Sequence, residues 1–160
     1  MKRIYLDNAA ATPMDPRVLD VMMPYLTTAY GNPSSLHYFG QQARAAVQTA
    51  RSQGAHCLGV KGEDLVFTSG GTEADNLAIL GFLRANFRDG GHLITPAVEH
   101  HAVLRTFQAL EQKGYDVTYV PVEADGRVTA DAVAQALRDD TVLISVMYAN
   151  NETGMVQPVD

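Results

Sequence analysis

The chain has 160 residues, of which 46% are hydrophobic and 19% charged, and its formal net charge is −6. This is the composition of a soluble globular protein with enough residues for a real core, and without a long charge run it favours neither a nucleic-acid nor a membrane partner. Cys57 is the single cysteine, which excludes an internal disulfide and a cysteine zinc cluster, and we expect no metal site. No apolar run has membrane-spanning length and the N-terminal residues do not have the pattern of a signal peptide; with a single cysteine, a reducing, cytoplasmic setting is expected.

The first third of the sequence predicts one short strand and two helices. Ile4–Leu6 is strand-like, and Asp15-Pro16 is typical of a helix start, with Asp as the N-cap and Pro at the first helical position. A second helix carries apolar residues at helical spacing from Phe39 to Leu58 and ends near Gly59. Cys57 lies on that apolar stripe, which favours a buried, inert thiol over a nucleophile.

Four further strand candidates alternate with helices. The predicted strands cover 65–68, 93–95, 117–120 and 142–147, and the predicted helices cover 74–88, 100–113 and 129–138. The helix at 74–88 is apolar almost all round and is therefore expected to be buried. This alternation predicts an α/β fold with a mostly parallel sheet and helices on both faces. In such sheets ligands bind beyond the carboxyl ends of the strands.

A glycine turn, Ser69-Gly70-Gly71-Thr72, joins the first of these four strands to its helix. Glycine permits positive φ and close approach of a ligand to the backbone, and Thr72 is a candidate N-cap. Because the start of a helix has free N–H groups, the turn is suited to an anion such as a phosphate. A capped helix without any ligand is an equally good interpretation, and the carboxylates of Glu73 and Asp75 would have to point away from a bound anion.

Two other strand ends also carry polar residues. Glu99-His100-His101 follows the second strand, and Asn150-Asn151 follows the fourth. Each has a structural alternative, since a histidine can simply start a helix and asparagine tolerates turns. Because carboxyl ends of parallel strands share one edge, we interpret the three loops together as a site.

Five motifs then give a resemblance to a known family. They are Tyr5–Pro13, Gly31–Ser35, Phe67–Ala78, Glu99–Val103 and Asn150–Gly154. In this order and spacing the chain resembles the amino-terminal part of the NifS/IscS-type cysteine desulfurases, pyridoxal-phosphate enzymes of the class V aminotransferase family. The resemblance implies the first part of a fold-type I large domain at 15–160. It also implies an amino-terminal segment at 1–14 that packs toward the small domain.

The resemblance also implies roles for four residues. Gly71 and Thr72 would bind the phosphate of pyridoxal 5'-phosphate through a backbone N–H and a hydroxyl. His100 would stack on the cofactor ring and move protons, as an imidazole can near neutral pH. Asn151 would donate a hydrogen bond to the cofactor's ring oxygen.

The implied reaction is conversion of L-cysteine to L-alanine, with persulfide sulfur passed to an acceptor or scaffold protein for iron–sulfur cluster or thiocofactor assembly. The family's Schiff-base lysine and catalytic cysteine have no match here, so we expect part of a longer protein, a homodimer at full length, and no activity from the 160-residue chain alone. The alternatives are a selenocysteine lyase, a small-molecule aminotransferase of the same fold, or a non-catalytic assembly module that completes a partner chain.

Overall fold

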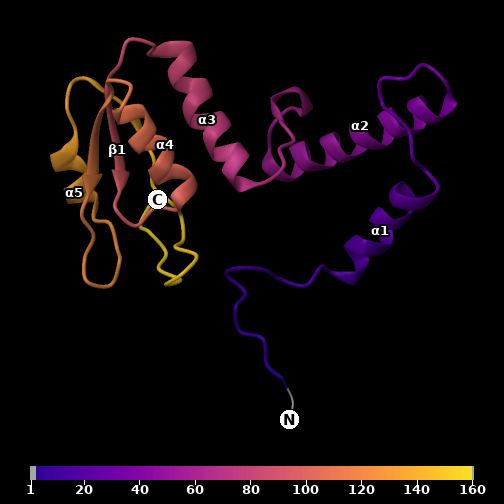
Figure 1. Cartoon of the computed structure of the whole chain (residues 1–160), viewed down its shortest axis with the longest axis horizontal. Helices are drawn as coiled ribbons and strands as arrows, with labels where there is room; N and C mark the ends of the chain where they lie inside the picture. Colours follow the sequence, from indigo (N-terminus) through magenta and orange to yellow (C-terminus); the bar gives the residue numbers. More distant parts are fainter. Residues whose placement is uncertain (1–2, 160) are drawn as a thin grey trace. The chain divides into compact units, whose positions relative to one another are not determined.

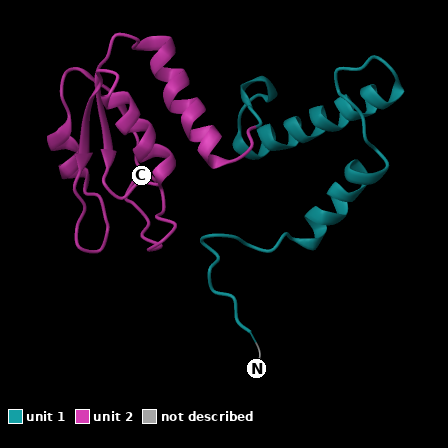
Figure 2. Ribbon diagram, viewed as in Figure 1, with its two compact units in different colours: residues 1–67 teal, residues 68–160 magenta. Residues whose placement is uncertain are grey.

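The computed structural model describes residues 3–159 and divides into two compact units, residues 1–67 and residues 68–160 (Figure 2). The boundary falls between Phe67 and Thr68, directly before the glycine turn. The predicted division at residues 14 and 15 concerns a complete enzyme and stays a prediction. Among the described residues, no helix combines the length and apolar character that crossing a membrane requires.

The first unit contains two helices, α1 (Pro16–Thr27) and α2 (Tyr38–Leu58), and a short 3-10 turn, η1 (Gly62–Asp64). The predicted start of α1 is confirmed: an Asp15 carboxylate oxygen accepts the backbone N–H of Arg17 at 2.8 Å, and proline follows the cap. The predicted end of α2 is also confirmed, because Gly59 takes the left-handed conformation at φ 67° that a side chain would disfavour.

Three predictions for this unit are wrong. Ile4–Leu6 forms no strand and its side chains are exposed, and Leu65–Thr68, at the boundary with the second unit, forms no strand either. The carbonyl of Leu65 accepts a hydrogen bond from the Arg51 guanidinium instead of entering a ladder. Cys57 is exposed rather than buried. Apolar spacing makes a strand or a buried face possible, but each also requires a second element to pair with it or cover it.

The second unit contains three helices and three strands in alternation (Figure 1). They are α3 (Gly71–Asn86), β1 (His92–Pro96), α4 (His101–Glu111), β2 (Asp116–Val120), α5 (Ala130–Ala136) and β3 (Thr141–Ile144). The strands form a parallel sheet in the order β2-β1-β3, with Leu93 opposite Val117 and Leu143. The predicted α/β fold with a parallel sheet is confirmed, although β3 is shorter than the predicted run at 142–147.

The central strand β1 is buried along its whole length and its side chains enter two cores. Leu93 packs with side chains of α3 and α4, among them Leu83 and Phe107, whereas Ile94 packs with Val120 and Val128 and with partly buried residues of α5. Adjacent residues of a strand point to opposite faces, so α3 and α4 cover one face of the sheet and α5 covers the other. This arrangement places the segment after β1 at the centre of the sheet's carboxyl edge.

Helix α3 is less buried than its composition predicts. Ile79 and Leu83 are buried, but Leu77 and Phe82 are 50% and 42% exposed. The buried pair packs in the core with residues of α4 and the sheet and Leu80 is partly buried against it, whereas Leu77 and Phe82 remain largely exposed. The prediction of a fully buried helix is therefore wrong for this structure, for the same reason as at Cys57.

Candidate active site

The glycine turn leads directly into α3. The helix begins at Gly71 with Gly70 as its cap residue, and no side chain caps it. Thr72 is therefore the second helical residue, and its prediction as the N-cap is wrong. Gly70 has φ 162°, an extended conformation open to any residue, so neither glycine is required here for a left-handed backbone. Nothing lies within 4 Å of where a Cβ would stand on either glycine, which leaves the turn open to a ligand.

The first turn of α3 presents unsatisfied donors. The first helical hydrogen bond runs from Ala74 to the Gly70 carbonyl, and within residues 3–159 no acceptor meets the backbone N–H groups of Gly71, Thr72 and Glu73. The Glu73 carboxylate turns back and accepts the N–H of Ser69 at 2.6 Å, a bond that lowers the pKa of this carboxyl. Because the Glu73 carboxylate is bound to the Ser69 N–H, it does not occupy the three free N–H groups, which stay available to a ligand.

His100 is the N-cap of α4. Its Nδ1 accepts the backbone N–H of Ala102 at 3.1 Å, so in this arrangement the neutral ring carries its proton on Nε2. The structural interpretation of this histidine as a helix start is therefore confirmed. It does not compete with a chemical role, because Nε2 stays free of the cap. His101 is the first residue of α4, and its ring lies 6.5 Å from that of His100 and tilted by 47°.

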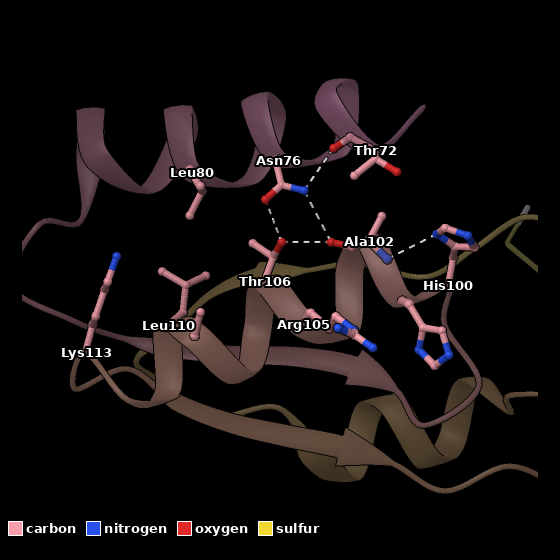
Figure 3. Close-up of a pocket in the computed structure, with 11 residues that line it drawn as sticks. Thr72, Asn76, Leu80, His100, Ala102, Arg105, Thr106, Leu110 and Lys113 are labelled. Carbon is pink, nitrogen blue, oxygen red and sulfur yellow. Dashed lines mark hydrogen bonds between the residues drawn. The ribbon is translucent and has the colours of Figure 1, made fainter. Parts of the chain in front are cut away.

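One open pocket of about 410 Å³ lies between α3 and α4, and both Thr72 and His100 line it (Figure 3). Asn76 joins the two helices beside these residues: its Nδ2 donates to the carbonyls of Thr72 and Ala102, and its Oδ1 accepts from the Thr106 hydroxyl. Thr72 and His100 stand at one end of the pocket and Lys113 at the other (Figure 3). The structure thus brings the glycine-turn residue and the imidazole together, as their places along the sequence suggested.

The third predicted loop reaches the same edge through Asn150 rather than Asn151. Asn150 Nδ2 donates to the Val98 carbonyl at 3.0 Å, in the segment between β1 and α4. The side chain of Asn151 is exposed and does not line the pocket, nor does Gly71. The cofactor-binding roles predicted for Gly71, Thr72, His100 and Asn151 remain predictions. That Thr72 and His100 line one pocket, in contrast, follows from the fold.

Comparison with known proteins places this geometry in a family. The family model described as Aminotransferase class-V matches residues 4–160, which is nearly the whole chain. The chain belongs to the class-V aminotransferase family. The five motifs that gave the resemblance all lie within the matched range, so the family assignment made from the residues is confirmed.

Individual family members are similar over the full chain but are much longer. The IscS 1 protein of Bacillus subtilis (strain 168) is 54% identical over 160 residues, and the cysteine desulfurase IscS of Methanosarcina thermophila is 48% identical over 158. A solved structure of a NifS-like protein superposes with a TM-score of 0.93 at 39% identity, covering 99% of this chain and 43% of the other. The chain spans 42% and 39% of the two curated relatives, less than half of either.

One buried acid, directly before His100, was given no role from the sequence. Glu99 is only 6% exposed, and its Oε1 has no hydrogen-bond partner among the described residues; the same holds for Oγ1 of the buried Thr95. Burial raises the pKa of Glu99, and the charge of Asp75 acts in the same direction, whereas the backbone N–H groups of Met147 and His100 oppose it. A carboxylate next to a helix start looks like a surface residue in the sequence, so no local signal announces its burial.

Proposed function

We propose that this chain is the amino-terminal, cofactor-holding part of a pyridoxal-phosphate-dependent cysteine desulfurase. The complete protein would convert L-cysteine to L-alanine and deliver sulfur as a persulfide for iron–sulfur cluster or thiocofactor assembly. The observation that carries the proposal is that Thr72, in the first turn of α3 where the N–H groups are free, and His100 line the same end of the pocket between α3 and α4 (Figure 3). The relatives named cysteine desulfurase supply the reaction class.

The residues present fit the phosphate of the cofactor. Unsatisfied N–H groups at Gly71, Thr72 and Glu73 are suited to phosphate oxygens, and the helix dipole favours the negative charge. Within the described residues the Thr72 hydroxyl has no partner, so it can donate to the same group. The absence of side chains at Gly70 and Gly71 leaves the approach open. We therefore assign Gly71 and Thr72 to phosphate binding.

Bound pyridoxal phosphate would supply an electron sink for bond cleavage at the substrate, while the protein supplies position and proton transfer. His100 is suited to hold or move a proton at Nε2, because its Nδ1 is fixed by the Ala102 N–H and the ring orientation is thereby restrained. Asn151 extends an exposed amide from the turn after β3, and we assign it the hydrogen bond to the cofactor's ring oxygen.

The partners proposed for the complete protein follow from the same reaction. They are L-cysteine as substrate, a sulfur-acceptor or scaffold protein, and a second copy in a homodimer. A cytoplasmic setting suits a reaction that depends on a reactive persulfide, because thiols stay reduced there. The lysine and cysteine that the family uses would come from the part of the relatives' length that this chain does not span.

The test uses the full-length protein, meaning a polypeptide with these residues and the further length that the relatives have. It is titrated with pyridoxal phosphate and then given L-cysteine or, in a parallel sample, L-selenocysteine, while alanine and the released sulfide or selenide are measured. Saturable cofactor binding with equal yields of alanine and transferable sulfur is expected. Alanine formed only from L-selenocysteine, or transamination in place of sulfur release, would overturn the desulfurase assignment. The 160-residue chain alone should give no turnover above free cofactor.

A further inference from the structure

Both polar side-chain atoms of Asn150 form hydrogen bonds, whereas the exposed side chain of Asn151 forms none with the described residues. Its Oδ1 accepts the backbone N–H groups of Glu152 and Thr153, both at 2.9 Å. Its Nδ2 donates to the Val98 carbonyl at 3.0 Å and approaches Met147 Sδ at 3.5 Å. The side chain therefore does two separate things: it closes its own turn through the oxygen and reaches another loop through the nitrogen.

The turn itself is closed by the backbone as well. Asn150 N–H donates to the Met155 carbonyl and the Gly154 N–H donates to the Asn150 carbonyl, both at 2.8 Å. Gly154 has φ 75°, in the left-handed region, which lets the chain reverse at this point. Residues 150–155 thus form a turn closed by hydrogen bonds, and Asn151 lies within it.

The Val98 carbonyl belongs to the short segment that presents His100. This segment, residues 97–100, is fixed at one end by the bond from the Ala97 N–H to the Val120 carbonyl and at the other by the start of α4. The loop after β1 is therefore joined to the chain after β3 at the carbonyl of Val98.

From these contacts we infer that Asn150 is a positioning residue that ties the 150–154 turn to the 97–100 segment and thereby sets Asn151 relative to His100. Asn151 is the residue that is free to meet a ligand, and Asn150 is the one that fixes its place. This inference rests on the proposed function, because the ligand that Asn151 would meet is pyridoxal phosphate. The link between the two loops, however, is a property of the protein alone and can be measured without any cofactor.

The two functions of Asn150 can be separated by substitution. Asn150→Asp keeps an oxygen that can accept from Glu152 and Thr153 but has no donor for Val98. Asn150→Ser adds no charge: its shorter side chain keeps an oxygen for the turn and loses the amide N–H that reaches Val98. Thr153→Ala is the matched control, because Thr153 Oγ1 accepts only the Met155 N–H within the same turn, at 3.3 Å. Asn151→Ala serves as the reference for loss of the proposed cofactor contact.

Two measurements on the full-length protein decide the inference. Hydrogen exchange without cofactor should rise by about tenfold at residues 97–100 in Asn150→Asp and Asn150→Ser, while Glu152 and Thr153 stay protected. With pyridoxal phosphate added, the absorbance maximum, or the pH midpoint of its change, should move in the direction that Asn151→Ala moves it. Thr153→Ala should leave both readouts as in the unsubstituted protein.

Unchanged exchange at residues 97–100 in both donor-deleted variants would overturn the link. Faster exchange together with a cofactor spectrum like that of the unsubstituted protein would overturn the positioning role, provided that Asn151→Ala alters the spectrum. If the unsubstituted protein binds no pyridoxal phosphate, the proposed function fails, and the exchange result by itself then supports or overturns the link between the loops.

Discussion

The Thr106 hydroxyl lies 2.8 Å from Asn76 Oδ1, a contact that joins α4 to α3 beside the pocket. Thr106 is buried, and its one hydroxyl proton has two acceptors within reach, Asn76 Oδ1 and, at 2.7 Å, the Ala102 carbonyl, so Thr106→Val removes the donor from both. We expect a loss of about 1–3 kcal/mol in the free energy of unfolding, whereas Thr106→Ser keeps the hydroxyl and should lose less. Denaturant unfolding of both variants, with Asn76→Ala and the double variant as a cycle, measures the coupling. Full additivity would show that the bond contributes nothing.

Thr72→Ala should separate cofactor binding from helix stability. Because Thr72 does not cap α3, its loss should leave the melting temperature nearly unchanged. Loss of a hydrogen bond to a charged phosphate costs about 1.5–3 kcal/mol, which corresponds to roughly 10- to 160-fold weaker pyridoxal phosphate binding. Thr72→Ser retains the hydroxyl and should bind close to normally. Equal affinity in the alanine variant would assign no phosphate contact to Thr72.

His100 has a capping role and a proposed proton-transfer role, and two variants distinguish them. His100→Asn keeps an acceptor for the Ala102 N–H, so stability should be retained while the chemical steps slow by about 10²–10⁴-fold. His100→Ala should show the same slowing plus about 1 kcal/mol of lost stability. Single-turnover kinetics with L-cysteine and thermal unfolding give the two readouts.

His101→Ala is the control for that pair, because His101 lines the same pocket but does not cap α4. Its rate and stability should both stay near those of the unsubstituted protein. If His101→Ala were slow and His100→Asn reacted at the normal rate, the proton transfer would belong to His101 and the assignment to His100 would be wrong.

His92 predicts a pH dependence of stability. It is fully buried, with Nδ1 2.8 Å from the Thr141 hydroxyl and Nε2 2.8 Å from the Thr118 hydroxyl. Burial lowers the pKa of His92, the Arg138 guanidinium lowers it further, and Asp140 and Asp116 act in the opposite direction. The unfolded chain therefore takes up this proton at a higher pH than the folded chain does. Stability from His92 is present above about pH 6.5 and is lost as the pH falls below it.

Denaturant unfolding at pH 7.5 and pH 5.5 tests this dependence. The unsubstituted protein should lose more stability between the two values than His92→Gln, which cannot titrate. His56→Gln is the matched control, since His56 is exposed, and it should follow the unsubstituted protein. An equal loss in all three proteins would contradict a neutral, buried His92.

Local sequence determined the elements whose signals are complete within a few residues. The Asp15-Pro16 start of α1, the Gly59 end of α2, and the strands β1, β2 and β3 follow from capping, backbone conformation and short apolar runs. The alternation of strands with helices also determined the parallel sheet, because such strands need a crossover connection. The family motifs in their order were sufficient for the family assignment.

Tertiary structure alone decided what each side chain meets. Leu65–Thr68 and Cys57 have the composition of a strand and of a buried face, but pairing and burial depend on elements far away in sequence. Asn150 and Asn151 are the same residue type side by side, and only a bond to Val98, 52 positions earlier, makes the first structural and leaves the second free. Glu99 is buried for the same reason: the ends of three elements converge on it, and no local pattern encodes that convergence.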